Sequence, residues 1–416
     1  MSHPTGNSNV RAVISALNCA GMLQEFNTTL AINPEAKWLK FIPGTLSMQL
    51  LRRTFPLGSD MLKSWPSLEM VRLISPSIGC KGFVNEENSW ASIDSVYRKL
   101  DRSVARRLNT LVRVHSINAV YGYEDGALNT FRLAKDLGLK CIYDLPIAYW
   151  ETSRRLLQEE ALRLPTWAKT LGGGIQDSAE KLERKTEELQ LADVVIGPGD
   201  FVLNSIPDWA KHKHLIMTPY GSPQTAQTLS QQIRKRQSKL RVLFVGSMTQ
   251  RKGLADLFEA VSLVNSSQLE LVVLGSPMAP LKFYKDELPN FEYYANRSHN
   301  KVLELMRSCD VLCLPSIVEG RALVMQEAMS QGLPIIITNN TGGSDLVEPG
   351  RTGFLVPIRS PEAIAKKLSW LLENRAMIPE MGFEAFHHAK RYTWEAYGQN
   401  IVSAFSKFTA LLALQT

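Results

Sequence analysis

Short apolar runs alternate with segments of helical period through the second half of the chain. Runs rich in β-branched residues and bounded by Gly or Pro predict strands at residues 241–246, 270–275, 310–315 and 333–338. Apolar residues that recur every three to four positions predict helices near 253–265, 299–308, 322–331 and 361–374. The last helix begins at Pro361, with Ser360 as its expected N-cap. This alternation is typical of a parallel sheet covered by helices, so we expect a Rossmann-like domain here.

The first half repeats the pattern more loosely. Strands are predicted at residues 118–123, 139–145, 193–197 and 214–219. A helix is predicted from about 178 to 190, with Asp177 or Ser178 as its N-cap. Residues 221–239 are rich in Ser, Gln and Thr and poor in large apolar side chains, which indicates an inter-domain linker. The strands and the linker together predict an α/β protein with two Rossmann-like domains, residues 1–220 and 221–391, and parallel sheets facing a central cleft.

Composition excludes several classes of protein. The chain has 416 residues, 44% of them hydrophobic and 21% charged, which favours two globular cores over disorder or a coiled coil. No apolar run approaches the roughly 20 residues that span a bilayer, and the first residues do not resemble a signal peptide, so we expect a cytoplasmic protein. Five scattered cysteines without a Cys-x-x-Cys motif are expected to be buried thiols rather than disulfides or zinc ligands. A net charge of +7 without a dense basic stripe fits an anionic small ligand or membrane surface, and we expect no nucleic-acid partner.

The segment 242–253 has the features of a phosphate site. Its strand ends at Gly246, and Arg251 and Lys252 precede a helix that starts near Gly253. Helix N-terminal amides, a guanidinium and an ammonium all favour an anion there. The alternative is an exposed, solvated Arg-Lys pair.

The segment 314–329 places one carboxylate in a loop after a strand and another in the following helix. Glu319, in the loop, can reach a group held in the cleft. Glu327 lies eight residues later in an apolar helix, where an unpaired carboxylate would cost several kcal/mol, so a polar partner is expected. For Glu327 a buried salt bridge or a helix cap is the structural alternative.

Four motifs together resemble the donor half of the family-4 retaining glycosyltransferases of the GT-B fold. They are Gln250-Arg-Lys-Gly253, Glu319-x7-Glu327, Thr341-Gly-Gly-Ser-Asp345 and Gly353-Phe-Leu-Val-Pro357. The resemblance is strong over residues 240–375, fair over 193–221 and weak before about residue 115. It implies a GT-B fold with an N-terminal acceptor domain, a C-terminal donor domain and a last helix, about 392–414, that packs back on the first domain.

The resemblance implies a nucleotide-diphosphate sugar as donor. Arg251 and Lys252 would hold the diphosphate, Glu327 the ribose hydroxyls and Glu319 hydroxyls of the sugar. The whole implied donor site consists of Gly246, Arg251, Lys252, Arg297 near the base, Gly320, the amides of Arg321, Ala322 and Leu323, and Glu327. Departures from the family pattern are Ser247, Arg321-Ala322 and Asp345, and Arg321 is expected to mark either a donor sugar with an acidic group or an unusual acceptor.

In the first half, acceptor and sugar contacts are expected in the loops after strands. The loop 123–127 matches one in which relatives contact the donor sugar, so Glu124 and Asp125 are catalytic candidates, with an acidic N-cap as the alternative for Asp125. Asp144 could orient an acceptor hydroxyl, and Trp150 offers a stacking face. Residues 3–7 resemble a loop near the phosphates or acceptor, which adds Gly6 and Asn7 with His3. The strand expected before this loop is missing, so either this strand is only a stub or the sequence as given starts late.

The expected activity is therefore retaining, metal-independent transfer of a sugar to an acceptor hydroxyl. No Asp-x-Asp or His-Glu-x-x-His occurs, and Gly197-Pro-Gly199 is not a dinucleotide motif, so neither a metal site nor a cofactor is expected. The partners would be the nucleotide-sugar and a sugar, lipid-linked or small-molecule acceptor, in glycolipid or cell-surface polysaccharide synthesis, with peripheral contact at the inner membrane face left open. An epimerase of the same fold and a non-catalytic nucleotide-sugar-binding partner subunit remain as alternatives.

Overall fold

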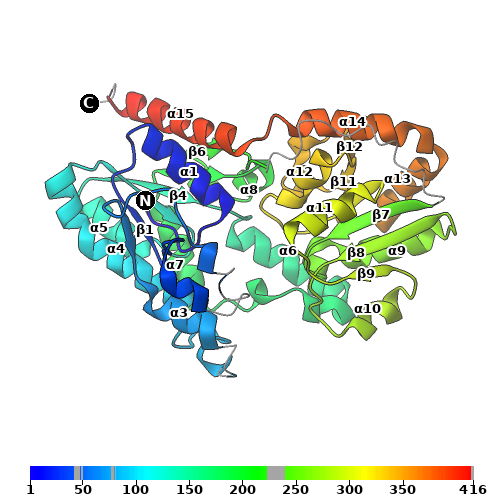
Figure 1. Ribbon diagram of the computed structural model, residues 1–416, viewed down its shortest axis with the longest axis horizontal. Helices are drawn as coiled ribbons and strands as arrows, with labels where there is room; N and C mark the ends of the chain where they lie inside the picture. Colours follow the sequence, from blue (N-terminus) through cyan, green and yellow to red (C-terminus); the bar gives the residue numbers. More distant parts are fainter. Residues whose placement is uncertain (42–46, 48–49, 76–78, 80, 223–238, 414–416) are drawn as a thin grey trace.

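The computed structural model describes residues 1–41, 47, 50–75, 79, 81–222 and 239–413. The chain forms two lobes, each with its own parallel sheet (Figure 1). Residues 223–238, which make up most of the predicted linker, lie outside the described residues. The predicted boundary between residues 220 and 221 therefore stays a prediction.

The second lobe contains a six-stranded parallel sheet in the order β12-β11-β10-β7-β8-β9. Its strands are β7 (Leu240–Val245), β8 (Leu269–Leu274), β9 (Glu292–Tyr294), β10 (Val311–Leu314), β11 (Ile335–Ile337) and β12 (Gly353–Leu355). Its helices are α9 (Leu254–Val264), α10 (Leu281–Glu287), α11 (His299–Arg307), α12 (Leu323–Ser330), α13 (Pro361–Glu373) and α14 (Ile378–Ala389). The strand and helix predictions for this half are confirmed, although Ser360 stands at the N-cap of α13 without a side-chain capping bond. β7 and β10 are buried along their whole length because helices cover both faces of the sheet.

The first lobe has a four-stranded parallel sheet in the order β3-β4-β5-β6 and a separate pair, β1-β2. The strands are β1 (Phe26–Thr28), β2 (Leu62–Ser64), β3 (Ala119–Tyr123), β4 (Lys140–Asp144), β5 (Val194–Gly197) and β6 (His214–Met217). The helices are α1 (Ser8–Cys19), α3 (Pro66–Ile74), α4 (Ile93–His115), α5 (Leu128–Asp136), α6 (Trp150–Arg163), α7 (Ala179–Leu191), α8 (Asp200–Asn204) and, from the chain end, α15 (Trp394–Ala413). The predicted strands and the helix at 178–190 are confirmed, and the N-cap of that helix is Ser178, whose hydroxyl accepts from Lys181 N.

Two segments pack on one lobe although the elements next to them in sequence belong to the other lobe. Helix α15 lies along α1, and its residues Tyr397 and Ile401 join the core of the first lobe (Figure 1). The 3-10 helix η4 (Pro165–Thr170), which follows α6, inserts Trp167 into the core of the second lobe. Neither lobe is therefore built from one continuous stretch of sequence.

Most of the described cysteines are buried, as expected, but one is not. Cys141, Cys309 and Cys313 are buried, whereas Cys19 is exposed at the end of α1, so the prediction of buried thiols is wrong at this position. Cys80 lies outside the described residues. Among the helices that the structure describes, none is long and apolar enough to cross a membrane.

Candidate active site

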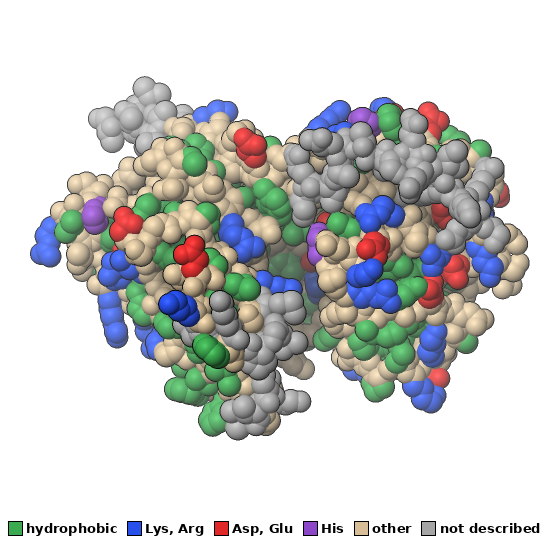
Figure 2. All heavy atoms as spheres, viewed as in Figure 1, with side chains coloured by type: hydrophobic (Ala, Val, Ile, Leu, Met, Phe, Trp, Pro, Cys, Tyr) green, Lys and Arg blue, Asp and Glu red, His purple; other side chains and the backbone are tan. Residues whose placement is uncertain are grey.

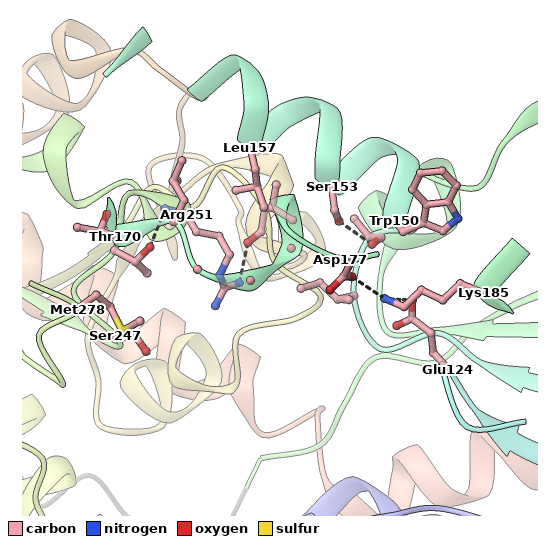
Figure 3. Close-up of a pocket in the computed structure, with 18 residues that line it drawn as sticks. Glu124, Trp150, Ser153, Leu157, Thr170, Asp177, Lys185, Ser247, Arg251 and Met278 are labelled. Carbon is pink, nitrogen blue, oxygen red and sulfur yellow. Dashed lines mark hydrogen bonds and ion pairs between the residues drawn. The ribbon is translucent and has the colours of Figure 1, made fainter. Parts of the chain in front are cut away.

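A cavity of about 310 Å³ lies between the two lobes and is lined by both (Figure 3). The space-filling view shows the molecule hollowed at this junction (Figure 2). From the first half, the cavity is lined by polar and aromatic side chains that include Glu124, Trp150, Asp177 and Lys185. From the second half, it is lined by residues of the loops after β7, β8 and β10, which include Ser247, Thr249, Arg251, Met278 and Val318.

Two glycines with positive φ shape the loop after β7. Gly246 has φ +148°, and a Cβ there would lie 2.8 Å from the Lys252 side chain, so a glycine lets the lysine fold back over the strand end. Thr249 caps the short 3-10 helix Gln250–Lys252 by accepting from Arg251 N. Gly253 then adopts φ +72° against Pro315 O, where a Cβ would be 2.0 Å away. This turn places Arg251 in the cavity wall at the mouth of α9.

Glu319 is the counter-ion of the two predicted phosphate ligands. Its carboxylate lies 2.5 Å from Lys252 Nζ and 3.2 Å from an Arg251 guanidinium nitrogen. Burial acts to raise the pKa of Glu319, but the two cations outweigh it and hold the pKa below its usual value. The structure thus brings Arg251, Lys252 and Glu319 together as predicted residues of one site, with the carboxylate bound to the cations rather than standing alone.

The loop after β7 is held in part from the first half of the chain, which sequence reasoning missed. Gln250 N donates to Thr170 Oγ1 at 3.0 Å, and Gln250 Nε2 donates to both Glu160 and Asp256 at 2.7 Å. Glu160 is fully buried and also accepts from Arg163 and Arg359. The residue next to Arg251 is therefore fixed by a buried polar cluster to which α6, η4 and Asp256 of α9 contribute.

Arg321 and Asp345, two of the residues that depart from the family pattern, form one ion pair. Both terminal guanidinium nitrogens of Arg321 contact the Asp345 carboxylate, at 2.7 and 2.9 Å, and the side chain is fully buried. Its guanidinium is engaged inside the protein, which corrects the expectation that Arg321 marks an acidic donor sugar. Ala322 N donates to Thr341 O at 3.4 Å, so this amide of the α12 start is not turned toward a ligand as predicted.

Gly320 lies against the first lobe just before the start of α12. A Cβ on Gly320 would lie 1.8 Å from Pro146 O, so only a glycine fits against the first lobe there. Leu323 is the first residue of α12 and packs on the apolar core of the first lobe. These two predicted residues therefore lie at the junction, and neither lines the cavity.

The two acidic candidates of the first half have different surroundings. Glu124 lines the cavity and lies 3.4 Å from Lys185 Nζ; burial raises its pKa. Asp125 has φ +67° and turns toward α7, where its carboxylate accepts from Arg184 Nε at 2.8 Å. The amides at the start of α5 are capped by Glu188, so the N-cap alternative for Asp125 is wrong. Asp125 does not line the cavity, which leaves Glu124 as the acidic candidate within it.

The predicted acceptor residues Gly6, Asn7 and Asp144 lie outside the cavity lining. Asp144 is buried, accepts from Tyr121 Oη at 2.7 Å and has its pKa raised by burial to about 7. Gly6 packs against Arg52 O, and Asn7 occupies the exposed N-cap position of α1. His3 packs its ring 4.2 Å from that of Tyr123, and burial lowers its pKa to about 3.

The residues predicted to contact the ribose and the base, Glu327 and Arg297, do not line the cavity. Glu327 is partly buried, and within the described residues its ion-pair partner is His299, with Nδ1 at 3.9 Å. Burial raises the pKa of Glu327, and His299 acts against that rise. Arg297 is exposed and stacks its guanidinium 4.0 Å from the Tyr294 ring centre.

Sequence reasoning missed the basic side of the cavity. Lys185 Nζ lies between Glu124 and Asp177, at 3.4 and 3.6 Å (Figure 3). Lys181, Arg184 and Lys185 stand at helical spacing on α7, so a basic face toward the cleft could have been read from the sequence. Trp150, at the start of α6, lines the same cavity and donates through Nε1 to Thr186.

Comparison with known proteins shows what the second half of the chain resembles. The family model for glycosyl transferases group 1 matches residues 225–388, the part of the chain that carries Arg251, Lys252, Glu319 and Glu327. Residues 225–388 are thus similar to the group 1 glycosyl transferases. A D-inositol 3-phosphate glycosyltransferase of Corynebacterium glutamicum is 28% identical over 178 residues, which is 40% of this chain and 43% of the relative. The spore coat protein SA of Bacillus subtilis is 24% identical over 186 residues, 40% of this chain and 48% of the relative.

Solved structures extend the likeness to the whole fold. Sucrose-phosphate synthase of Thermosynechococcus elongatus superimposes with a TM-score of 0.62 at 17% identity, covering 97% of this chain and 93% of that protein. Anabaena HepE in complex with UDP and glucose gives 0.59 at 14% identity, with 98% of both chains covered. The chain thus has the GT-B fold, as the motifs predicted. The chain spans less than half the length of these curated relatives.

Proposed function

We propose that the chain transfers a sugar from a nucleotide-diphosphate donor to an acceptor hydroxyl with retention of anomeric configuration. The observation that carries the proposal is the cavity in which Arg251 of the second half and Glu124 of the first half share one space. A donor bound by its diphosphate at Arg251 and Lys252 can extend its sugar into that space. Members of family 4 act in this way, and the four motifs of the second half support membership.

The donor phosphates are proposed to replace Glu319 at the two cations. In the structure Glu319 pairs with both Arg251 and Lys252 and offsets one of their two positive charges, which keeps them oriented before a ligand arrives. Negative charge that develops on the departing diphosphate would then meet both cations in a mostly buried site, where electrostatic stabilisation is strong. The two side chains supply positive charge without a metal, so we propose metal-independent transfer in which the departing phosphate takes the acceptor proton.

The acceptor is proposed to bind on the first-half wall. Trp150 offers an aromatic face, and Glu124, Asp177 and Lys185 offer hydrogen-bonding groups within the same cavity. Aromatic faces beside carboxylates suit a polyhydroxylated ligand, because sugar C–H faces are apolar and their hydroxyls donate to carboxylates. We propose that the acceptor is a sugar or a lipid-linked sugar. It would serve glycolipid or cell-surface polysaccharide synthesis at the inner membrane face.

A nucleotide panel tests the proposal. Wild-type protein is titrated with UDP-, GDP- and ADP-sugars by thermal shift, and release of nucleoside diphosphate is followed with candidate acceptors. Lys252→Ala should abolish both the thermal shift and nucleotide release, whereas Lys282→Ala, at an exposed lysine of α10, should change neither. A ligand at 100 times its Kd adds about 2.7 kcal/mol, which the shift would report.

Three outcomes would contradict the proposal. Absence of any nucleotide shift in the wild type would favour a non-catalytic subunit. An altered free sugar formed without acceptor would favour an epimerase. A thermal shift retained in Lys252→Ala would show that the diphosphate does not bind at this loop.

A further inference from the structure

The cations that line the active-site cavity are already paired with carboxylates. Among the described lining residues, the cations are Arg251 and Lys185. Arg251 pairs with Glu319 and belongs to the proposed donor site. Lys185 Nζ lies 3.4 Å from Glu124 and 3.6 Å from Asp177, and both carboxylates line the same cavity (Figure 3). On the acceptor wall, the ammonium of Lys185 is therefore held between two negative charges.

The other two cations of the same face of α7 are matched in the same way. Lys181 Nζ lies 3.2 Å from Asp94 and 3.1 Å from Asp177. Arg184 Nε donates to Asp125 at 2.8 Å, and Arg184 Nη2 contacts Asp94. Within the described residues, the three cations of this face thus pair with four carboxylates, those of Asp94, Glu124, Asp125 and Asp177.

These ion pairs are mostly shielded from solvent. The side chains of Lys185 and Glu124 are 13% and 7% exposed. Burial acts to lower the pKa of Lys185, but Glu124, Asp125 and Asp177 outweigh it and raise the pKa, so the ammonium stays charged. A phosphate at this wall would have to displace a carboxylate from Lys185 or lie beside it. Like charges repel most strongly where water is scarce, so the wall disfavours a phosphate.

The rest of the cavity lining carries no charge. Apart from the ionic residues, the described lining consists of glycines and uncharged side chains, among them Trp150, Ser153 and Thr249. Gly172 and Gly173 leave open space, because a Cβ on either would meet no atom within 4 Å. A hydroxylated ring suits this wall, since its C–H faces are apolar and its hydroxyls donate to carboxylate oxygens, which accept several hydrogen bonds each.

We propose that the part of the acceptor that enters this cavity is an uncharged polyol, and that Glu124 and Asp177 select against phosphorylated sugars by holding Lys185. This inference rests on the proposed transferase function, whose acceptor class it narrows. A phosphate elsewhere in the acceptor, such as that of a lipid linkage, would stay outside the cavity. Selectivity of this kind comes from repulsion of the wrong ligand as well as attraction of the right one.

Removing one carboxylate should turn Lys185 into a phosphate site. The full chain is titrated with inorganic phosphate in an Arg251→Ala background, in which Lys185 is the remaining cation among the described lining residues. The indole N–H signal of Trp150, assigned through Trp150→Phe, reports binding by NMR. Adding Asp177→Asn should lower the Kd for phosphate at least tenfold, because one of the two carboxylates that compete for the ammonium is gone.

A matched control removes the same charge elsewhere. Adding Asp208→Asn instead should leave the Kd unchanged, since Asp208 is exposed and outside the cavity lining. Asp177→Asn is expected to fold, because Lys181 keeps Asp94 and Lys185 keeps Glu124 as partners.

Turnover measures the same selectivity in the unmodified protein. Release of nucleoside diphosphate is compared for each sugar that supports turnover and its phosphate, such as glucose and glucose 6-phosphate. The wild type should prefer the unphosphorylated sugar at least tenfold in kcat/KM, and Asp177→Asn should reduce this preference through the KM of the phosphorylated form.

Two results would overturn the inference. One is an equal Kd for phosphate with and without Asp177→Asn in the Arg251→Ala background. The other is a wild-type preference for the phosphorylated sugar. Absence of any nucleotide thermal shift would instead contradict the proposed function alone, because the phosphate titration needs no nucleotide.

Discussion

Replacing Glu319 by Gln should lower the free energy of unfolding and also lower the Kd for a nucleoside diphosphate. Glu319 is 14% exposed and pairs with Lys252 at 2.5 Å and Arg251 at 3.2 Å. Its loss leaves two cations without a counter-charge in a largely buried site. Removing one partner of a buried pair costs about 3–5 kcal/mol, and because Gln keeps the shape and one acceptor oxygen we expect about 1–3 kcal/mol here. At roughly 2–4 °C per kcal/mol for a domain of this size, the Tm should fall by about 2–12 °C.

The same change should favour the ligand phosphates. In the wild type an incoming diphosphate must displace the carboxylate from both cations, and in Glu319→Gln it does not. We expect the Kd of the nucleoside diphosphate to fall by about tenfold, which corresponds to 1.4 kcal/mol. Calorimetric titration with UDP, GDP and ADP measures it, with Glu304→Gln as control, since Glu304 is exposed and pairs with Lys301.

The corresponding nucleotide-sugar separates two roles of Glu319. If Glu319 also accepts sugar hydroxyls, as the family resemblance implies, the variant should gain less affinity for the nucleotide-sugar than for the nucleoside diphosphate, and turnover should fall. An unchanged or weaker affinity for the nucleoside diphosphate in Glu319→Gln would refute the counter-ion reasoning.

Three further changes probe other parts of the account. Burial raises the pKa of Asp144 from 3.8 to about 7, so between these pH values the native state holds a proton that the unfolded state has lost, and the stability that this group contributes at low pH is lost as the pH rises toward 7. In parallel melts between pH 4 and 8, Asp144→Asn should therefore gain up to about 4 kcal/mol of stability over the wild type as the pH rises. Trp150→Ala should raise the KM for the acceptor several-fold with little change in donor affinity, whereas Trp209→Ala, at an exposed tryptophan, should alter neither. Glu160→Ala removes a fully buried carboxylate that Gln250, Arg163 and Arg359 contact, so it should lower the free energy of unfolding by about 3–5 kcal/mol and weaken nucleotide binding. If the folded variant retained its nucleotide affinity, Gln250 would not position Arg251.

The second lobe could be predicted closely because local signals agree there. Strands buried on both faces are continuous apolar runs, and Gly or Pro bounds each predicted one, so the predicted strands and helices lie within a few residues of β7, β8, β10, β11, α9, α11, α12 and α13. The candidate phosphate site could be proposed for the same reason, because Gly246, Arg251 and Lys252 are close in sequence.

Contacts between distant segments could not be predicted in the same way. The pair Arg321–Asp345 looked like two unrelated departures, because 24 positions separate residues that meet in the fold. The insertion of Trp167 into the second lobe has no local signature, since an apolar residue in a short helix suits either core. Asp125 and Glu124 are neighbours in sequence, yet the positive φ of Asp125 turns its side chain toward Arg184 and away from the cavity.

The most direct test of the central claim is a crystal structure of the protein with a bound nucleotide-diphosphate sugar. The account predicts diphosphate oxygens within hydrogen-bond distance of Arg251 and Lys252, Glu319 released from at least one of them, and the sugar in the cavity that Glu124 and Trp150 line. A donor whose phosphates contact neither cation, or whose sugar points out of that cavity, would contradict it.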